Sequence, residues 1–171
     1  QVVTGIIDDS RLKSELKYVR INGNKMEYKL KTGGNYTVVF DGAIGNNMFE
    51  WDKICNKKKK KKVSTFIYNR RGYGFNDGVD PRTPEEQAKD LKALLKKAGA
   101  PQPYVLVGEE YGSLVVTNFI KLYPESVAGV VLVDPISEEK ISTKEYKDSI
   151  KFKYYRSKFE EMGSYFSLTS L

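Results

Sequence analysis

The sequence predicts an α/β protein: a mostly parallel sheet flanked by helices, with an antiparallel hairpin at its N-terminal end. Three observations support this class. Apolar segments without strict alternation recur from residue 36 onward, which is typical of strands buried on both faces. Segments with helical periodicity separate these strands, and this alternation favours parallel strands joined by right-handed crossovers. Two alternating segments around Asn22-Gly23-Asn24 precede them and predict the hairpin.

The first elements follow from turn residues and apolar segments. Residues 1–15 are polar, and we expect them to form a flexible segment before the core. In the hairpin, Gly23 supplies the backbone freedom that the turn requires. Glycine pairs and polar residues then delimit three short apolar segments, which predict a buried strand at 36–40, a short helix at 48–55 and a second buried strand at 63–68.

The clearest helix covers residues 83–98. Thr83 is its expected N-cap, Pro84 occupies the first helical position, and Glu86 completes a capping box with Thr83. Gly99 follows the last apolar residue as the C-terminal stop. The remaining core elements are expected in the order of a strand at 104–108, a helix at 111–124 and a strand at 127–134.

Residues 137–171 differ in composition from the preceding segments, because they are rich in lysine, glutamate and aromatic residues. Their loosely helical spacing predicts one or two amphipathic helices lying over the sheet, as packing elements or as a lid. The predicted organisation is therefore an N-terminal segment at 1–15, a core at 16–136 and the start of a helical cap at 137–171, with the cap incomplete.

Composition limits the chemistry available to this chain. The 171 residues are 40% hydrophobic and 30% charged, which is typical of a globular protein. There is one cysteine, Cys55, for which a buried thiol is favoured over a reactive one, and there is no histidine. Histidine is the usual general base near neutral pH and the commonest metal ligand. We therefore predict no metal site and no cofactor.

The net charge of +7 arises almost entirely from one tract, Lys57–Lys62. Without these six lysines the balance is 7 − 6 = +1, so the rest of the chain forms no broad basic surface. A solvated loop is the interpretation that the composition favours, and a patch for an anionic membrane surface is the alternative. No aromatic residue interrupts the tract, so we do not expect nucleic-acid binding.

The segment "YVLVGEEYGSLVV" at 104–116 contains the candidate site. A strand ends at Gly108, two glutamates follow, and a helix begins near Gly112. Glycine at these two positions lets the strand and the helix approach closely. This G-x-Z-x-G frame between a strand and a helix is that of the nucleophile elbow, in which the central residue is usually serine. Here the central residue is Glu110.

Four ordered sequence blocks resemble the α/β-hydrolase superfamily: "YNRRGYG", "PRTPEEQAKDLKALLKKAG", "YVLVGEEYG" and "VVLVDP". The resemblance covers roughly residues 16–135 and implies an α/β-hydrolase-like fold. It places Glu110 at the nucleophile position and Glu109 at the residue before it. It also implies oxyanion-hole amides at Ala43, next to Gly42, and at Tyr111. The ligand it implies is a small ester or amide.

This chain departs from the pattern in three ways. Glutamate replaces serine at the elbow, no histidine is present, and the family's catalytic acid and histidine come from strands later than those predicted here. In one interpretation, Glu110 accepts hydrogen bonds from the two amides and occupies the oxyanion hole. In another, it is a carboxylate nucleophile like the elbow aspartate of haloalkane dehalogenases and epoxide hydrolases.

Three functional hypotheses follow from these features. The first is a hydrolase-fold protein that is catalytically impaired and binds a ligand in the old pocket. The second is part of a genuine hydrolase whose acid and histidine lie on a C-terminal fragment or a second chain. The third is a surface-binding module that uses Lys57–Lys62. A start at Gln1 and a single cysteine favour an exported or membrane-anchored protein only slightly over a cytoplasmic one.

Overall fold

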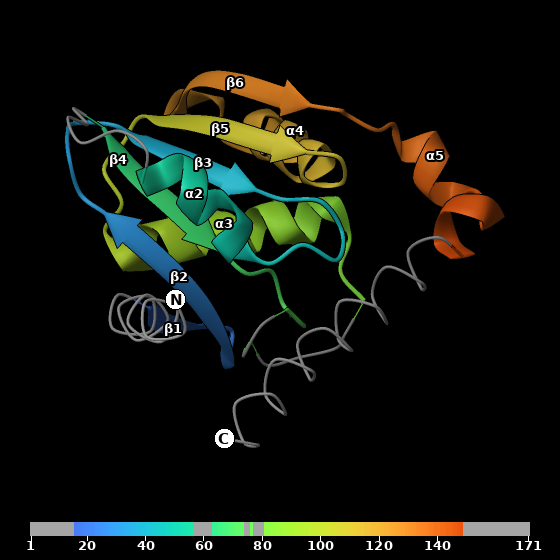
Figure 1. The fold of residues 1–171 in the computed structure, drawn as a ribbon, viewed down its shortest axis with the longest axis horizontal. Coiled ribbons are helices and arrows are strands. Elements are labelled where there is room, and N and C mark those ends of the chain that lie inside the picture. Colours follow the sequence, from blue (N-terminus) through green and yellow to red (C-terminus); the bar gives the residue numbers. More distant parts are fainter. Residues whose placement is uncertain (1–15, 57–62, 74–75, 77–80, 149–171) are drawn as a thin grey trace, which may run out of the picture.

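A computed structural model describes residues 16–56, 63–73, 76 and 81–148. The expected N-terminal segment, the lysine tract and the cap beyond residue 148 lie outside this described part. Six strands form one sheet in the order β1-β2-β4-β3-β5-β6 (Figure 1). The strands are β1 (Lys17–Ile21), β2 (Asn24–Lys31), β3 (Thr37–Asp41), β4 (Ser64–Tyr68), β5 (Tyr104–Glu109) and β6 (Val127–Val133).

The sheet combines antiparallel and parallel pairing. β1 pairs antiparallel with β2, and β2 pairs antiparallel with β4. From β4 through β3 and β5 to β6, all pairs are parallel. The hairpin therefore forms one edge of the sheet, as the sequence predicts. Its turn residues, Asn22 and Gly23, have φ angles of 49° and 82°, which are the positive values that a tight two-residue hairpin requires.

Helices cover both faces of the sheet. In Figure 1, α3 (Pro84–Ala98) and α4 (Gly112–Leu122) lie behind the sheet, and α2 (Asp52–Asn56) lies in front. Alternate residues of each strand point to opposite faces. Val39, Phe66 and Leu106 accordingly belong to the large core cluster with α3 and α4. The smaller cluster on the other face contains Phe40, Met48, Cys55, Ile67 and Val107.

The described part also contains three short helices, η1 (Met48–Trp51), η2 (Pro124–Ser126) and α5 (Glu138–Ser142), and residues 144–148 are helical as well. The helix expected at 48–55 is present, but it begins as the 3₁₀ turn η1 and continues as α2. The thiol of Cys55 is buried in the smaller cluster, in agreement with the interpretation as a buried residue. No helix in the described part of the chain has the length and hydrophobicity to cross a membrane.

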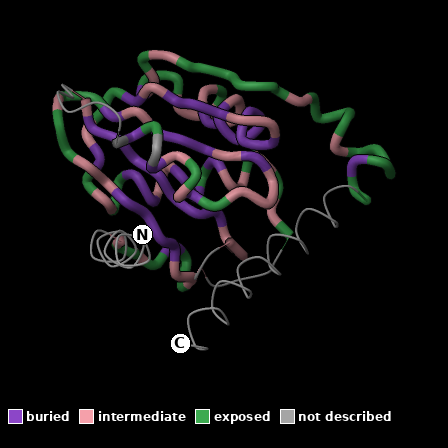
Figure 2. The backbone as a smooth tube through the Cα atoms, in the orientation of Figure 1, coloured by how far each residue is buried: buried purple, intermediate pink, exposed green. Residues whose placement is uncertain are grey.

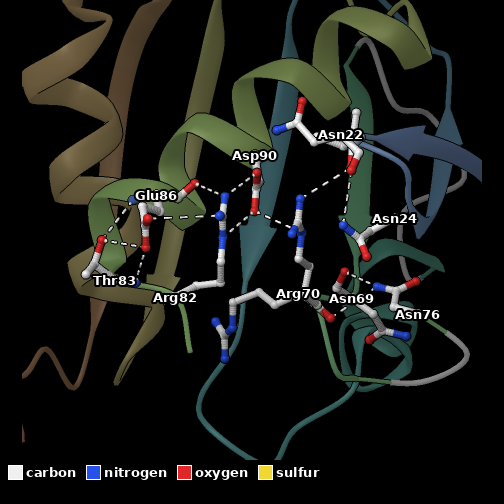
Figure 3. A network of polar contacts seen from close by, with 11 residues as sticks. Asn22, Asn24, Asn69, Arg70, Asn76, Arg82, Thr83, Glu86 and Asp90 are labelled. Carbon is white, nitrogen blue, oxygen red and sulfur yellow. Dashed lines mark hydrogen bonds and ion pairs between the residues drawn. The ribbon is translucent and has the colours of Figure 1, made fainter. Parts of the chain in front are cut away.

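Polar contacts at both ends of α3 fix its position. Thr83 Oγ1 accepts a hydrogen bond from Glu86 N at 3.2 Å, and Glu86 Oε2 accepts one from Thr83 N at 2.9 Å (Figure 3). Gly99 ends the helix at φ 69°. Further along the helix, the buried carboxylate of Asp90 accepts a hydrogen bond from Arg82 Nη2 at 2.6 Å. The sequence signals at both ends of this helix are therefore confirmed.

The strand β6 forms the second edge of the sheet and is unusually open. Val130, Val131, Leu132 and Val133 are 42–49% exposed, and Figure 2 shows most of the strand exposed. Consecutive strand residues point to opposite faces. Both faces of β6 are thus open to solvent in the described part of the chain, whereas parallel sheets normally bury both faces.

Candidate functional site

The turn between β5 and α4 adopts the geometry of a nucleophile elbow. Glu110 occupies the tip of the turn with a φ of 48°, a left-handed conformation that costs a non-glycine residue about 1–2 kcal/mol. Its backbone N–H donates to Val133 O at 3.0 Å, and its carbonyl accepts from Ser113 N at 3.0 Å. The strained residue is thus held from the β6 side and from the first turn of α4.

Gly108 and Gly112 occupy positions where no side chain fits. A Cβ at Gly108 would lie 2.6 Å from Val116 Cγ2 and 2.8 Å from Gly112 O. A Cβ at Gly112 would lie 2.2 Å from Asp41 O and 3.0 Å from Gly42 O. The glycines therefore allow the elbow to pack directly on the backbone at the end of β3, where the loop with Ala43 begins.

This loop after β3 is fixed by Arg70, which follows β4. Arg70 Nη1 donates to Gly42 O at 2.8 Å, and Nη2 donates to Ala43 O at 3.1 Å. The same guanidinium pairs with the carboxylate of Asp41, which also accepts a hydrogen bond from Tyr68 Oη at 2.5 Å. Arg70 thus makes structural hydrogen bonds to the loop after β3.

The charges in this cluster are buried and mutually compensating. Asp41 is 2% exposed and Arg70 is 6% exposed. Burial raises the pKa of Asp41, and the Arg70 charge and the Tyr68 hydrogen bond act against that rise. Burial lowers the pKa of Arg70, but the Asp41 carboxylate and the Tyr73 and Tyr68 phenols together outweigh burial, and the pKa lies above its ordinary value. Arg70 therefore stays charged, and Asp41 balances that charge.

The two backbone amides implied as an oxyanion hole belong to loops that contact each other through Gly112. Ala43 is 7% exposed and Tyr111 is 9% exposed. Among the described residues, neither amide N–H donates a hydrogen bond to the protein. If Glu110 occupied the oxyanion hole, the Ala43 or Tyr111 amide would donate a hydrogen bond to the Glu110 carboxylate. No such hydrogen bond joins the described residues. Glu109 lies at the end of β5, opposite Val133 of β6.

One neighbour of the elbow was missed in the sequence. Tyr146 lies after α5, and its side chain is 7% exposed. Burial raises its pKa, and the charge of Glu110 raises the pKa further, which places the phenol near the elbow carboxylate. The aromatic spacing in 137–171 predicted a packing element or lid but did not distinguish Tyr146 from the other aromatics. Its position is a tertiary contact that helical periodicity does not encode.

A shallow polar pocket lies beside the loop after β3. It encloses about 240 Å³ of empty space that includes open solvent, and Asn46, Asn47 and Tyr73 contribute to its walls. Gly42 lines it as well, and a Cβ there would lie 3.3 Å from Trp51 Nε1. In the described ranges, no three carboxylate or cysteine side chains are grouped as metal ligands would be. The arrangement can offer hydrogen-bond donors to a small polar molecule.

Comparisons with known proteins identify the fold. Residues 36–158 match the family described as alpha/beta hydrolase fold. The chain belongs to this α/β-hydrolase family. An uncharacterized Bacillus subtilis protein, YqjL, is 28% identical over 106 residues, which are 61% of this chain and 42% of YqjL. The fold class predicted from the sequence, including the α/β-hydrolase resemblance, is therefore confirmed.

Solved structures of α/β hydrolases show the same architecture. Est816, described as an N-acyl homoserine lactone degrading enzyme, superimposes with a TM-score of 0.63 at 21% identity, over 70% of this chain and 45% of Est816. A thermophilic esterase from Thermogutta terrifontis gives a TM-score of 0.60 at 23% identity, over 72% of this chain and 48% of the esterase. The chain thus spans less than half the length of these relatives, and the likeness establishes the fold alone.

Proposed function

We propose that the elbow of this α/β-hydrolase chain binds a small ester- or lactone-like compound and that its own residues do not turn the compound over. The observation that carries the proposal is the pair of backbone amides, Ala43 and Tyr111, beside a strained elbow whose central residue is Glu110. Two such amides are suited to a carbonyl oxygen. The esterase and the lactone-degrading enzyme with this fold support the choice of ligand class.

The chain lacks the groups that two steps of ester hydrolysis require. Acyl transfer at an elbow requires a nucleophile activated by a base, and the base is then needed again to activate water. Glu110 replaces the usual serine, and the sequence contains no histidine. A carboxylate that attacked an ester carbonyl would form an anhydride and would expel an alkoxide, which is a much poorer leaving group. We therefore expect binding without multiple turnover.

The proposal is tested by titrating the ¹⁵N-labelled chain with N-butanoyl homoserine lactone and following the amide resonances. We expect saturable shifts at Ala43 and Tyr111, and lactone consumption no faster than in buffer. Glu110→Gln should strengthen binding because it removes a negative charge beside the carbonyl oxygen. The matched control, Glu109→Gln, should change affinity less because that residue belongs to the strand. Absence of shifts at both amides, or sustained lactone hydrolysis, would contradict the proposal.

A second candidate function uses Glu110 as a nucleophile toward alkyl carbon, and the nearby phenol of Tyr146 favours it. A carboxylate oxygen would attack an epoxide carbon, the ring C–O bond would break, and the resulting alkoxide would take a proton from the Tyr146 phenol, which water would then reprotonate. Without a base to hydrolyse the ester, the adduct should accumulate. Incubation with styrene oxide followed by peptide mass spectrometry tests this candidate. An adduct on Glu110 that Glu110→Gln abolishes supports it, and unmodified protein removes it.

We also propose that a further α/β segment, on the same polypeptide or on a second chain, completes the site by pairing with β6. The exposed valines and leucine of β6 support this proposal. Such a segment could contribute the acid and the histidine that complete a hydrolase. Addition of a candidate C-terminal fragment to this chain, with a Glu110→Ser substitution, should then generate activity toward p-nitrophenyl esters. A fragment that binds the chain without producing activity would contradict this role.

A further inference from the structure

The loop that contains Ala43 has no regular secondary structure, yet the direction of its amide decides whether a ligand carbonyl can be bound. An oxyanion donor must point to the place where the oxygen will lie. Glycine at position 42 leaves that peptide free to adopt other orientations. Within the loop, Asn46 N donates to Ala43 O at 3.3 Å, but this bond does not involve the Gly42 carbonyl. From outside the loop, Arg70 contacts the Gly42–Ala43 peptide through that carbonyl.

Arg70 contacts two consecutive carbonyl groups of this loop. Nη1 donates to Gly42 O at 2.8 Å and Nη2 donates to Ala43 O at 3.1 Å. In a trans peptide, the C=O of one residue and the N–H of the next point in opposite directions. Because the Gly42 carbonyl points toward Arg70, the Ala43 N–H must point away from it. The Ala43 N–H therefore lies on the side of this peptide that faces away from the guanidinium.

Arg70 also contacts the second donor residue. Its guanidinium carbon lies 5.1 Å from the ring centroid of Tyr111 and 5.3 Å from that of Tyr73. Arg70 itself is held by its ion pair with Asp41 at the end of β3. One buried side chain therefore connects the elbow, the loop after β3 and the loop after β4.

We propose that Arg70 is a positioning residue that orients the Ala43 amide toward the ligand and couples it to the Tyr111 amide at the elbow. The planar guanidinium of Arg70, whose N–H groups have a fixed arrangement, is required for this role. Lysine is a point charge on a flexible stem and cannot donate to two carbonyls in a fixed geometry while lying against aromatic rings. The role in ligand binding rests on the function proposed above, whereas the orientation of the amide does not.

The chain offers a matched control in the adjacent arginine. Arg71 is also buried and ion-paired, with Nε 3.3 Å from Asp90 Oδ2. Its Nη2 donates to Ile21 O at 3.2 Å, and none of its described contacts reaches Gly42 or Ala43. Arg71→Lys should therefore lower the stability of the fold as Arg70→Lys does, without changing the conformation of the loop that contains Ala43.

The test compares ¹⁵N-labelled wild-type protein with Arg70→Lys and Arg71→Lys. We expect Arg70→Lys to move or broaden the Ala43 amide resonance in the free protein and to weaken binding of N-butanoyl homoserine lactone by about fivefold, the effect of one lost hydrogen bond. Arg71→Lys should leave both unchanged. The double variant Asp41→Asn/Arg70→Gln removes both buried charges together, so it keeps the balance of charge and should give the same two effects.

Two results would overturn the inference. One is an Ala43 resonance that is no more perturbed in the two Arg70 variants than in Arg71→Lys. The other is unchanged lactone affinity in the Arg70 variants when wild-type protein binds the lactone. If wild-type protein does not bind the lactone at all, the proposed function fails, and the Ala43 resonance in the free proteins alone decides the role of Arg70.

Discussion

Glu110 has a backbone conformation that its residue type does not favour. Its φ of 48° lies in the left-handed region, where a side chain costs about 1–2 kcal/mol relative to glycine. Glu110→Gly should therefore stabilise the chain by roughly 0.5–1 kcal/mol after the added unfolded-state entropy of glycine is subtracted. Equilibrium urea unfolding measures the change. Asn22→Gly at φ 49° is the control, and it should gain less because asparagine tolerates this region.

A gain from Asn22→Gly as large as that from Glu110→Gly would show that the elbow carries no special strain. A loss on Glu110→Gly would show that the glutamate side chain makes contacts worth more than the strain. Either result would separate the backbone requirement at the elbow from the chemistry of its side chain.

Gly112 is required because the elbow touches the end of β3 through its backbone. A Cβ at this position would lie 2.2 Å from Asp41 O, and a backbone oxygen cannot move aside without displacing the strand. Gly112→Ala should destabilise the chain by about 1–3 kcal/mol through overpacking. Gly129→Ala in β6 is the control, because the nearest atom would be Val105 Cγ1 at 4.0 Å. Thermal unfolding of both variants checks this, and equal losses would contradict it.

At the scale of single elements, the capping box of α3 gives a prediction about pH. A hydrogen bond from the Thr83 backbone N–H, with a second from the Thr83 hydroxyl, lowers the pKa of Glu86 below its ordinary value of 4.5. A carboxyl with a lower pKa in the folded state contributes stability above pH 4.5 and loses it as the pH falls through the lowered value. Glu86→Gln retains the capping hydrogen bond but cannot titrate, so it should flatten the stability curve below pH 4.5.

Urea unfolding of wild-type protein and Glu86→Gln at several pH values between 6 and 3 measures this difference. Glu85→Gln is the control at the neighbouring exposed position, where Glu85 pairs with Lys89 at 2.6 Å outside the capping box. Parallel pH profiles for wild-type protein and Glu86→Gln would show that the cap does not depend on the charge of Glu86.

The elements were predictable from the sequence where local signals define them. Thr83, Pro84 and Gly99 fixed the ends of α3, and Asn22-Gly23 fixed the hairpin turn. The elbow was predictable because its glycines satisfy a backbone requirement within five residues. The place of β3 between β4 and β5 was not predicted, because strand order depends on packing between segments that are distant in the chain.

The candidate site was predictable only as far as backbone motifs define it. Glu110 follows from the elbow frame, whereas the oxyanion-hole amides of Ala43 and Tyr111 are what the α/β-hydrolase resemblance implies. The link from Arg70 to Asp41 and to the Gly42 and Ala43 carbonyls crosses 27 to 29 positions of sequence. Tyr146 reaches the elbow from a still more distant segment. Such contacts depend on side-chain direction in the folded state, so the sequence does not show what these residues touch.

At the scale of the whole molecule, the two edges of the sheet differ in character. The β1 edge belongs to an antiparallel hairpin, whereas β6 exposes apolar side chains on both faces. An exposed apolar edge strand offers free backbone groups and hydrophobic surface to any other strand. The chain expressed alone should therefore associate through β6 as its concentration rises, unless a completing segment is supplied.

Val131→Lys should weaken this association by about tenfold, because it replaces an apolar contact of roughly 1.5 kcal/mol with a charge at the edge. Val131 is 49% exposed, so the substitution should leave the fold intact. Tyr18→Lys on β1 is the matched control: Tyr18 is 62% exposed at the opposite edge, and its replacement should leave association unchanged.

Sedimentation velocity over a concentration series measures the association of wild-type protein and of both variants. If Tyr18→Lys weakens association and Val131→Lys does not, the contact lies at the hairpin edge. If the wild-type chain stays monomeric at every concentration, β6 does not recruit a strand by itself.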